Sequence, residues 1–308
     1  MPVEHPRVAV LLAAFNGMRW IEEQLASILN QSAVDVTVYI SIDPSTDCTE
    51  SWCADYAAHH AQVIVLPDAG SFGGASRNFF RLIRDVPVDE YDFIAFADQD
   101  DIWNLDKLDR ATQAIRLRQV DAYSSNVTAF WVDGRACLLD KGQPQVAWDY
   151  LFEAAGPGCT YVMSRRLMTQ LKASMLANWD ELQRVSLHDW YCYAYTRSHG
   201  YSWFIDPLSS MQYRQHEQNQ VGANAGLGSL IDRYKTIHDG WWFSQVRLIA
   251  RLVGVGDDAF VRRWLPLGRR QLLRLSLSAR HCRRRKRDKV FFFCICWITA
   301  VIGKKLND

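Results

Sequence analysis

Three carboxylates stand within four residues at the end of an apolar segment. The chain reads Asp98-Gln99-Asp100-Asp101 directly after Phe93–Ala97. Carboxylates at this spacing repel one another unless a cation or a hydrogen-bond network compensates their charge. A hard divalent ion, Mn²⁺ or Mg²⁺, binds through one or two carboxylates together with substrate phosphates. The motif therefore predicts a metal and phosphate site, and the alternative is a solvated acidic turn before a helix from Leu105.

Further candidate residues follow the first two apolar segments. Phe15 and Asn16 come after Arg7–Ala14, and Asp43 comes after Val34–Ile42. The carboxyl ends of parallel strands meet at one edge of a sheet, where ligands bind. These residues are therefore expected near the acidic motif, although Asp43 also fits the simpler role of an acid in the turn after a strand.

The elements that must position these residues alternate along the chain. Continuous apolar runs predict buried strands, and amphipathic patterns predict the helices between them. The expected strands are 7–14, 34–42, 62–66 and 93–97, and the expected helices are 20–30, 48–60 and 76–84. This rhythm predicts an α/β fold, a single Rossmann-like domain with a mostly parallel central sheet.

The rhythm breaks near residue 121. Ala122–Val132 and Thr160–Met163 predict strands on either side of a Gly-Pro-Gly turn at 156–158, which indicates a mixed sheet. We expect one domain over residues 1–228, with a ligand-binding half at 1–120 and an acceptor-binding half at 121–228. Residues 229–308 are expected to form a helical extension.

Composition indicates a globular protein with an asymmetric charge. Hydrophobic residues make up 49 % and charged residues 22 %, and the net charge is only +1. Residues 262–305 nevertheless hold 14 Lys and Arg against one acid, so the extension is built to meet anionic surfaces. The eight cysteines include no Cys-x-x-Cys pair, and no secretory signal is seen at the start of the chain. Free thiols in a reducing, cytoplasmic setting are expected.

The end of the extension combines a basic and an apolar segment. Arg280–Lys289 has seven basic residues, and Val290–Gly303 has 14 residues without a charge. A spanning helix needs about 20 apolar residues, so a helix lying on an anionic membrane surface fits better. A buried C-terminal helix is the alternative. A nucleic-acid partner is not expected, because no nucleic-acid-binding motif accompanies the basic segment.

Four separated motifs resemble family 2 glycosyltransferases in order and spacing. They are Leu11–Gly17, Asp43–Asp47, Asp98–Trp103 and Asp106–Leu108. The resemblance is strongest to bacterial rhamnosyltransferase-like members, which assemble surface polysaccharides such as O-antigen or capsule. It implies the A-type glycosyltransferase fold, a nucleotide-sugar donor, a divalent metal and inversion at the anomeric carbon.

The resemblance implies roles for the residues near the first strands. Phe15 and Asn16 would line the nucleotide pocket, and Asp43 would accept a hydrogen bond from the base. The family commonly has Asp-Asp-Gly-Ser where this chain has Ile-Asp-Pro-Ser, so only the second acid is kept. Arg77 and Asn78 would make further donor contacts, although Arg77 also fits a solvated helix position.

The resemblance also assigns the metal and phosphate contacts. Asp98 would touch the ribose or sugar, and Asp100 would hold the metal. A segment from Tyr213 to Asn219 resembles one that closes over the diphosphate. Within it, Arg214 would contact phosphate as a fixed cation. His216 would bind the metal or phosphate, against the alternative of a structural histidine.

Inversion requires a base that deprotonates the acceptor hydroxyl on the face opposite the leaving diphosphate. The segment Leu187–Tyr191 matches the place where the family carries this acid at a helix start, so Asp189 is the candidate base. The alternative is that Asp189 only caps its helix. His188 is expected to pack, and Gly158 and Cys159 are expected to shape the acceptor site.

These features predict a metal-dependent inverting hexosyltransferase at the cytoplasmic face of the bacterial inner membrane. Its partners would be a nucleotide-sugar donor, a lipid-linked saccharide acceptor and the anionic membrane surface. The donor expected first is dTDP-rhamnose. UDP-galactose or UDP-glucose is the alternative, because both bases offer the same imide N–H to Asp43. A nucleotidyltransferase and a non-catalytic scaffold are the rival classes, and the oligomeric state stays open.

Overall fold

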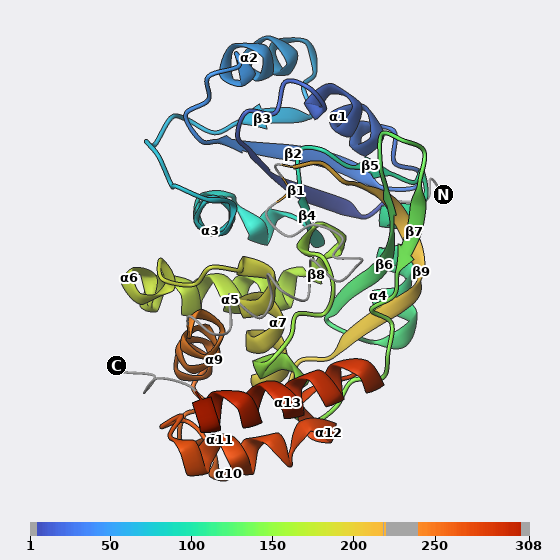
Figure 1. Cartoon of the computed structure of the whole chain (residues 1–308). Coiled ribbons are helices and arrows are strands. Elements are labelled where there is room, and N and C mark those ends of the chain that lie inside the picture. The colour runs from blue at the N-terminus through green and yellow to red at the C-terminus, as the bar shows by residue number, and fades with distance from the viewer. Residues whose placement is uncertain (1–4, 218, 220–239, 303–308) are drawn as a thin grey trace.

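The computed structural model describes residues 5–217, 219 and 240–302. Its centre is one sheet in the order β3-β2-β1-β4-β8-β6-β9-β5, with β7 paired to β6 (Figure 1). The strands of the first half pair in parallel: β1 (Arg7–Ala14), β2 (Asp35–Ile42), β3 (Val63–Val65) and β4 (Phe93–Ala97). All four carboxyl ends therefore meet at one edge of the sheet.

The first strand is buried on both faces, as its apolar sequence predicts. Ala9 and Leu11 belong to one core cluster, and Val8, Val10 and Leu12 belong to the other. The alternation follows from the two-residue period of a strand. Figure 1 shows α1 and α2 above the sheet and α3 below it. The helices of this half are α1 (Ile21–Leu29), α2 (Thr49–His59), α3 (Ala75–Asp85) and α4 (Lys107–Arg118).

The second half is mixed, as predicted. β8 (Val162–Ser164) runs antiparallel to both β4 and β6 (Ala122–Phe130). β9 (Trp203–Arg214) pairs in parallel with β6 and antiparallel with β5 (Ile102–Trp103). The remaining elements are β7 (Ala136–Leu139), α5 (Arg165–Ala177), α6 (Trp179–Leu182), α7 (His188–Ser198) and the 3₁₀ turns η1 (Val88–Glu90), η2 (Asp149–Leu151) and η3 (Gly158–Thr160). The predicted α/β class is confirmed.

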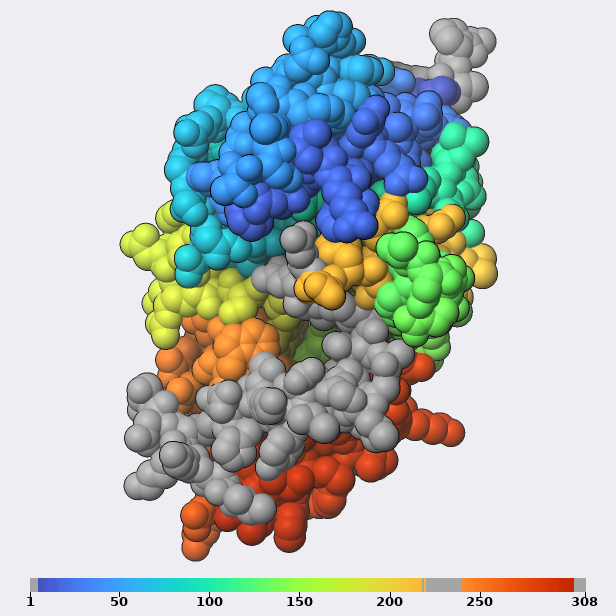
Figure 2. Space-filling model, turned by 45° about the horizontal axis from the view of Figure 1, so that its top comes forward, coloured from blue at the N-terminus to red at the C-terminus, as the bar shows by residue number. Residues whose placement is uncertain are grey.

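The described part of the C-terminal extension is helical, also as predicted. Its helices are α9 (Trp241–Leu252), α10 (Ala259–Arg262), α11 (Arg269–Ser276), α12 (Ala279–Cys282) and α13 (Lys286–Ile302). Figure 2 shows the first half of the chain and the C-terminal helices at opposite ends of the molecule. The part of the Tyr213–Gly222 segment beyond Asn219 lies outside the described residues.

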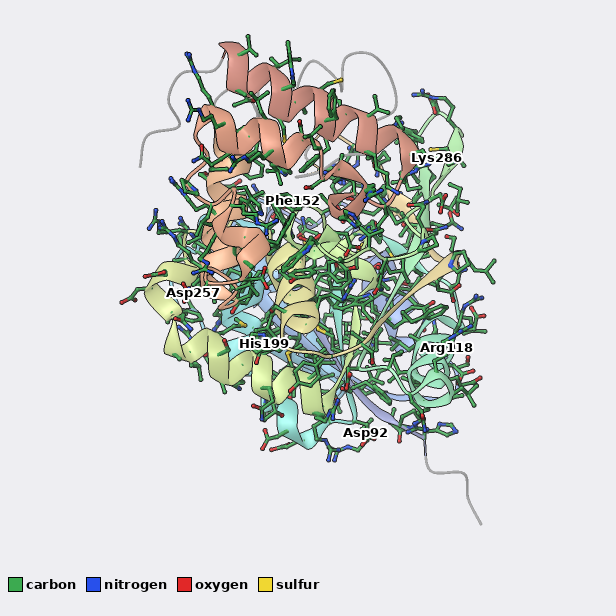
Figure 3. All side chains as sticks on the ribbon, turned by 90° about the horizontal axis from the view of Figure 1, so that it is seen from below. Asp92, Arg118, Phe152, His199, Asp257 and Lys286 are labelled. Carbon is green, nitrogen blue, oxygen red and sulfur yellow. The ribbon has the colours of Figure 1, made fainter. Side chains whose placement is uncertain are left out.

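Helix α13 has one face in the core and one face in solvent. Phe292, Ile295, Cys296 and Ala300 are buried in the same cluster as Phe152. The Phe152 and Phe292 rings meet edge to face at 5.1 Å, and Figure 3 shows Phe152 beside the C-terminal helices. The apolar run from Val290 thus supplies the protein core as well as a surface. In the part of the chain that the structure describes, no helix is both long enough and apolar enough to cross a membrane.

Candidate active site

The chain leaves β1 through a polar turn that is tied to the loop after β2. The Asn16 amide donates to Oγ of Ser45 at 3.0 Å, and Oδ1 of Asn16 accepts from the Thr46 amide at 2.8 Å. Asn16 has a φ of 49°, in the left-handed region that asparagine tolerates better than most residues. The turn leaves Phe15 54 % exposed at the edge where ligands are expected, so its ring face is open to a planar group.

Asp43 and Arg77 lie on either side of the loop before α3. The Phe72 amide donates to Oδ1 of Asp43 at 2.8 Å. Arg77 donates from Nε to the Gln183 carbonyl at 3.0 Å and from Nη1 to the Phe72 carbonyl at 3.4 Å. Asp43 and Arg77, both predicted to contact the nucleotide-sugar donor, thus bind the same loop. Arg77 also connects that loop to the segment preceding α7.

Asn78 is placed differently from its neighbour. It is 2 % exposed, its Nδ2 donates to the Ser41 carbonyl at 3.0 Å, and its Oδ1 accepts from the Ser41 hydroxyl. Both polar groups of the side chain are therefore used inside the protein. This favours a role in holding α3 against β2 over the predicted direct contact with a donor.

Gln99, inside the acidic motif, joins the end of β4 to the end of β1. Its Oε1 accepts from the Phe15 amide and its Nε2 donates to the Phe15 carbonyl, both at 2.8 Å. A Cβ at Gly17 would lie only 2.3 Å from Oε1 of Gln99, so glycine is required there for the close approach. These two hydrogen bonds fix the acidic motif relative to Phe15, where the nucleotide is predicted to bind.

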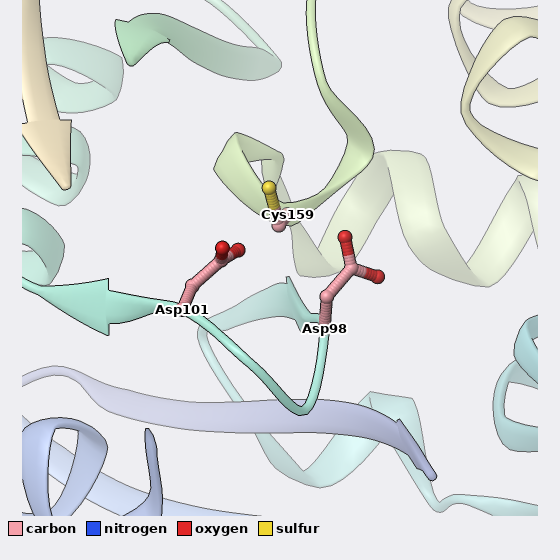
Figure 4. Close-up of side chains that lie close together, drawn as sticks. All are labelled: Asp98, Asp101 and Cys159. Carbon is pink, nitrogen blue, oxygen red and sulfur yellow. The ribbon is translucent and has the colours of Figure 1, made fainter. Parts of the chain in front are cut away.

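Asp98 and Asp101 of the motif converge with Cys159 of η3, with ligand atoms within 4.8 Å of one another (Figure 4). Asp101 and Cys159 are fully buried. Burial, together with the charges of Asp100 and Asp98, raises the pKa of Asp101 well above its usual range. Burial likewise raises the pKa of the Cys159 thiol, and a protonated thiol is a poor ligand for a hard divalent ion. Asp101 and Cys159 therefore form the floor of the site.

Lys107 supplies a buried positive charge behind this floor. The residue is fully buried, and Nζ lies 3.5 Å from the centre of the Trp103 ring. Burial lowers the pKa of Lys107 to about 7, and the nearby Cys159 and Asp101 act in the opposite direction. Within residues 5–217, 219 and 240–302, neither Nζ of Lys107 nor Oδ2 of Asp101 has a hydrogen-bond partner. The cation offsets part of the acidic charge without closing the open side of the motif.

Asp100 and His216, the two predicted metal residues, are brought together from distant parts of the chain. Oδ2 of Asp100 lies 2.7 Å from Nε2 of His216. The His216 ring stacks on Trp20 with the ring centres 4.1 Å apart, and the His216 amide donates to Oδ1 of Asn219 at 2.6 Å. The imidazole is thus held in one orientation beside the carboxylate.

Arg214 is tied to the acidic motif. Its amide donates to Oδ1 of Asp101 at 3.1 Å, and its Nε donates to the Asp100 carbonyl at 2.9 Å. Its Nη2 pairs with Glu23 of α1. Arg214 therefore holds the end of β9 against the motif, and its contact with phosphate stays a prediction.

Asp189 lies in the first turn of α7 and is partly exposed. Burial raises its pKa to about 6, while the Trp190 amide, which donates to Oδ1 at 2.8 Å, and the charge of Lys141 act in the opposite direction. Burial and the charges of Asp100 and Asp189 raise the pKa of Asp98 to about 7. The predicted base and the predicted metal motif thus meet in one site.

The turn before β8 is shaped to fit Asp189. A Cβ at Gly158 would lie 3.0 Å from both Cβ of Asp189 and Nε2 of His188, so a larger residue would displace the acid. His188 stacks on Phe79 with ring centres 3.9 Å apart, and burial lowers its pKa to about 3. His188 is therefore a neutral packing residue, in line with its expected role.

A buried ion-pair network, the C-terminal junction, holds α7 from the side of the extension. Nη1 of Arg284 lies 3.1 Å from Oδ2 of Asp149, and Nη1 of Arg197 lies 3.2 Å from Oδ1. The Tyr193 hydroxyl also donates to Asp149, at 2.8 Å. Because Arg197 and Tyr193 belong to α7, Arg284 joins the extension to the helix that carries Asp189.

Several residues of the site carry no sequence pattern that assigns their role. Gln99 and Lys107 stand in or near motifs, but their contacts become visible only in three dimensions. Trp20 and Lys141 lie in segments that predict only a helix start and a loop. A tryptophan at a helix start usually packs in a core, so its stacking on His216 has no sequence signature.

Comparison with known proteins agrees with this arrangement. A family model described as "Glycosyltransferase like family 2" matches residues 5–204. The chain is 43 % identical over 281 residues to the dTDP-rhamnosyl transferase RfbG of Shigella flexneri, covering 91 % of this chain and 96 % of that protein. It is 25 % identical to the putative teichuronic acid biosynthesis glycosyltransferase TuaG of Bacillus subtilis (strain 168), over 53 % of this chain and 64 % of that one.

Solved structures show the same fold at low identity. S. aureus TarS in complex with UDP-GlcNAc aligns with a TM-score of 0.55 and 13 % identity, covering 96 % of this chain and 90 % of that one. The mannosyltransferase PcManGT from Pyrobaculum calidifontis, in complex with GDP-Man and Mn²⁺, aligns with a TM-score of 0.51 and 14 % identity over 98 % and 88 % of the two chains. The fold is the A-type glycosyltransferase fold, and the chain belongs to glycosyltransferase family 2.

Proposed function

We propose that this glycosyltransferase moves rhamnose from dTDP-rhamnose to the saccharide of a lipid-linked acceptor, with inversion and with the aid of a divalent metal. The observation that carries the proposal is that one turn, Gly158–Cys159, contacts both Asp189 and the acidic motif: the Gly158 position lies against Asp189, and Cys159 lies within 4.8 Å of Asp98. The donor is suggested by the S. flexneri relative, a dTDP-rhamnosyl transferase that matches nearly the whole chain.

The nucleotide would bind across the ends of β1 and β2. The exposed Phe15 ring offers a surface on which a base can stack, and the Phe72 amide fixes the Asp43 carboxylate through Oδ1. Asn16 would shape the pocket through its bonds to the loop after β2. Arg77 keeps guanidinium donors that its two carbonyl partners do not use, which suits a negatively charged donor.

The open side of the acidic motif fits a divalent ion. Two neighbouring ligands of an octahedral ion at about 2.1 Å lie about 3 Å apart. Oδ2 of Asp100 and Nε2 of His216 are 2.7 Å apart, so both atoms can bind one ion with little movement. A Mn²⁺ or Mg²⁺ ion there would neutralise the charge that develops on the leaving diphosphate. Asp98 would face the ribose or sugar, and Arg214 would add positive charge near the diphosphate.

Replacing Asp100 with asparagine is expected to reduce transfer about 100-fold at low Mn²⁺, because one carboxylate ligand is lost. Raising the Mn²⁺ concentration should recover part of the rate, and EDTA should stop the wild-type enzyme. The measurement is release of nucleoside diphosphate against metal concentration. Asp106→Asn, an exposed change outside the motif, is the control. A wild-type rate that is unaffected by EDTA would contradict the metal site.

Asp189 is placed to act as the base. Its carboxylate lies in the first turn of α7, partly open to solvent, with its position set by Gly158 and by the Trp190 amide. It would accept the proton of the acceptor hydroxyl while the oxygen of that hydroxyl attacks the anomeric carbon from the face opposite the diphosphate. The bond to the diphosphate breaks in the same step, which inverts the configuration.

The function is tested by incubating the purified full chain with Mn²⁺, a panel of lipid-linked saccharides and one of three donors. We expect dTDP release with dTDP-rhamnose to exceed UDP release with UDP-galactose or UDP-glucose by at least about tenfold, which corresponds to about 1.4 kcal/mol. Pyrophosphate release in place of dTDP would indicate a nucleotidyltransferase. Equal rates with the UDP-hexoses would contradict the proposed donor.

The outer face of α13 is the proposed contact with an anionic membrane. Val290, Phe293, Trp297 and Val301 are between 41 and 65 % exposed and recur every three or four residues, so they form one apolar line, the α13 stripe. Exposed Lys286 and Arg287 stand at its start. Apolar side chains next to basic ones suit an interfacial helix on the cytoplasmic face of the inner membrane.

Replacing both Phe293 and Trp297 with glutamate is expected to abolish flotation with vesicles that contain phosphatidylglycerol, because two charges replace the apolar contact. Leu117→Glu, at an 82 % exposed position on α4, is the matched control and should float like wild type. Equal flotation of all three proteins would remove the membrane assignment. Deleting the extension is the poorer test, since it also removes Arg284 from the C-terminal junction.

A further inference from the structure

Lys141 lies beside the same short turn as the proposed base. A Cβ at Gly156 would lie 3.6 Å from Cβ of Lys141, and a Cβ at Gly158 would lie 3.0 Å from Cβ of Asp189. Two residues span at most about 7 Å, so the two side chains flank one turn. The Lys141 amide also donates to Oδ1 of the buried Asn126 at 2.6 Å, which fixes the backbone of the lysine.

The ammonium group of Lys141 has no partner among the described residues, although two acids are near. The Arg284 amide donates to Oε1 of Glu153 at 2.7 Å. Arg283 lies 3.6 Å from Glu153 and 3.7 Å from Asp288. The arginines thus pair with Glu153 and Asp288, and the charge of Lys141 acts on Asp189, the proposed base. A partly buried ammonium with three unused donors is unfavourable unless it meets an anion.

We propose that Lys141 binds a phosphate group of the acceptor, on the side of Asp189 that faces the C-terminal helices. This inference rests on the proposed function, in which the acceptor saccharide is linked to a lipid. The electrostatic neighbours of Lys141 include Arg283, Arg284 and Asp288, and its charge also acts on Asp189, so the lysine lies near both the base and the start of α13. A lipid phosphate at the surface of the membrane would approach from there, while the saccharide reaches towards Asp189.

The nature of the side chain supports phosphate as the ligand. A lysine ammonium is a compact charge with three rotatable donors, and it binds phosphate as a point charge. The stem of Lys141 lies against the Gly156 position, which places the lysine beside the turn that also contacts Asp189. A donor diphosphate is less suited to this place, because the proposed donor contacts of Arg214 and His216 lie at the acidic motif.

The test measures binding of farnesyl diphosphate and of farnesol to the full chain, with dTDP and Mn²⁺ at saturation so that the donor site is filled. Lys141→Met should weaken farnesyl diphosphate binding about tenfold and leave farnesol binding unchanged, and Lys141→Arg should restore most of the affinity. Lys172→Met is the control, since this partly buried lysine donates to the Val86 carbonyl and lies near Asp85 and Asp89, none of which belongs to the proposed site. Circular dichroism checks that each variant is folded.

Each other outcome overturns the inference. Equal weakening of farnesol would indicate a structural role, and unchanged farnesyl diphosphate binding would mean that Lys141 does not contact phosphate. Reduced flotation of Lys141→Met with phosphatidylglycerol vesicles, at unchanged farnesyl diphosphate affinity, would assign the lysine to a lipid headgroup. Binding of farnesyl diphosphate requires no sugar transfer, so its result does not depend on the assay with dTDP-rhamnose and the UDP-hexoses. Failure of the rhamnosyl assignment can therefore be distinguished from failure of the Lys141 site.

Discussion

Asp189→Asn is expected to lower sugar transfer by roughly 10²- to 10⁴-fold, the range typical of losing a general base. Asparagine keeps the size of the side chain, and the Trp190 amide can still donate to its Oδ1. The amide cannot accept the proton of the acceptor hydroxyl, so only the chemical step is impaired. Donor binding should be unchanged, as measured by the rise in melting temperature with dTDP and Mn²⁺.

The pH dependence of kcat/KM in the wild-type enzyme provides a second test of Asp189 as the base. Since burial raises the pKa of Asp189 to about 6, the base is protonated and inactive below that pH. The logarithm of kcat/KM should therefore fall by one for each pH unit below about 6, at saturating Mn²⁺. Asp180→Asn, an exposed change in α6, is the control and should behave like wild type. Near-normal turnover of Asp189→Asn would show that another group takes the proton.

Arg284→Met is expected to lower the free energy of unfolding by roughly 3 kcal/mol, the usual cost of removing one partner from a buried ion pair. Asp149 is fully buried, and the Arg284 side chain is 1 % exposed. The methionine would leave the carboxylate with only Arg197 and the Tyr193 hydroxyl. The Ala154 carbonyl would also lose the hydrogen bond that Nη2 of Arg284 donates at 2.7 Å.

Urea unfolding followed by circular dichroism measures this effect. Arg287→Met removes a charge three residues away, from a side chain that is 72 % exposed, and should change the free energy of unfolding by less than about 0.5 kcal/mol. Equal losses in the two variants would mean that net charge in the extension matters and the C-terminal junction does not. A further Asp149→Asn change in the Arg284→Met background should recover part of the loss, because the uncompensated charge disappears.

The fold of the first half could be predicted from the sequence because its signals are local. A parallel strand buried on both faces is a continuous apolar run, and Arg7–Ala14 and Phe93–Ala97 have the same bounds in the structure. The acidic motif and Asp189 were also within reach, because each stands at the end of a strand or the start of a helix. The contacts of the loop after β2 are less evident from the sequence: Asp47 accepts a hydrogen bond from the Thr49 amide at the start of α2.

The remaining features depend on contacts between distant segments. Asn78 follows a glycine-rich loop and looks like a ligand residue, yet its amide is used by Ser41 of β2. The apolar run from Val290 does not show that half of it packs around Phe152. The sequence of the extension likewise does not show that Arg284 pairs with Asp149, 135 residues earlier in the chain. The surroundings of Lys141 cannot be read from the sequence either, because they depend on Arg283 of the extension pairing with Glu153 and Asp288.

The C-terminal junction has a consequence for the length of the acceptor that the enzyme can use. Arg284 stands just before α13 and pairs with Asp149, which also binds Arg197 and Tyr193 of α7, so the junction links the two helices. A bilayer that holds the α13 stripe would therefore also hold Asp189 at one height above the lipid. The length of the glycan between its lipid anchor and Asp189 would then decide which sugar ring presents its hydroxyl to the base. The protein would thereby select its acceptor by length as well as catalyse the transfer.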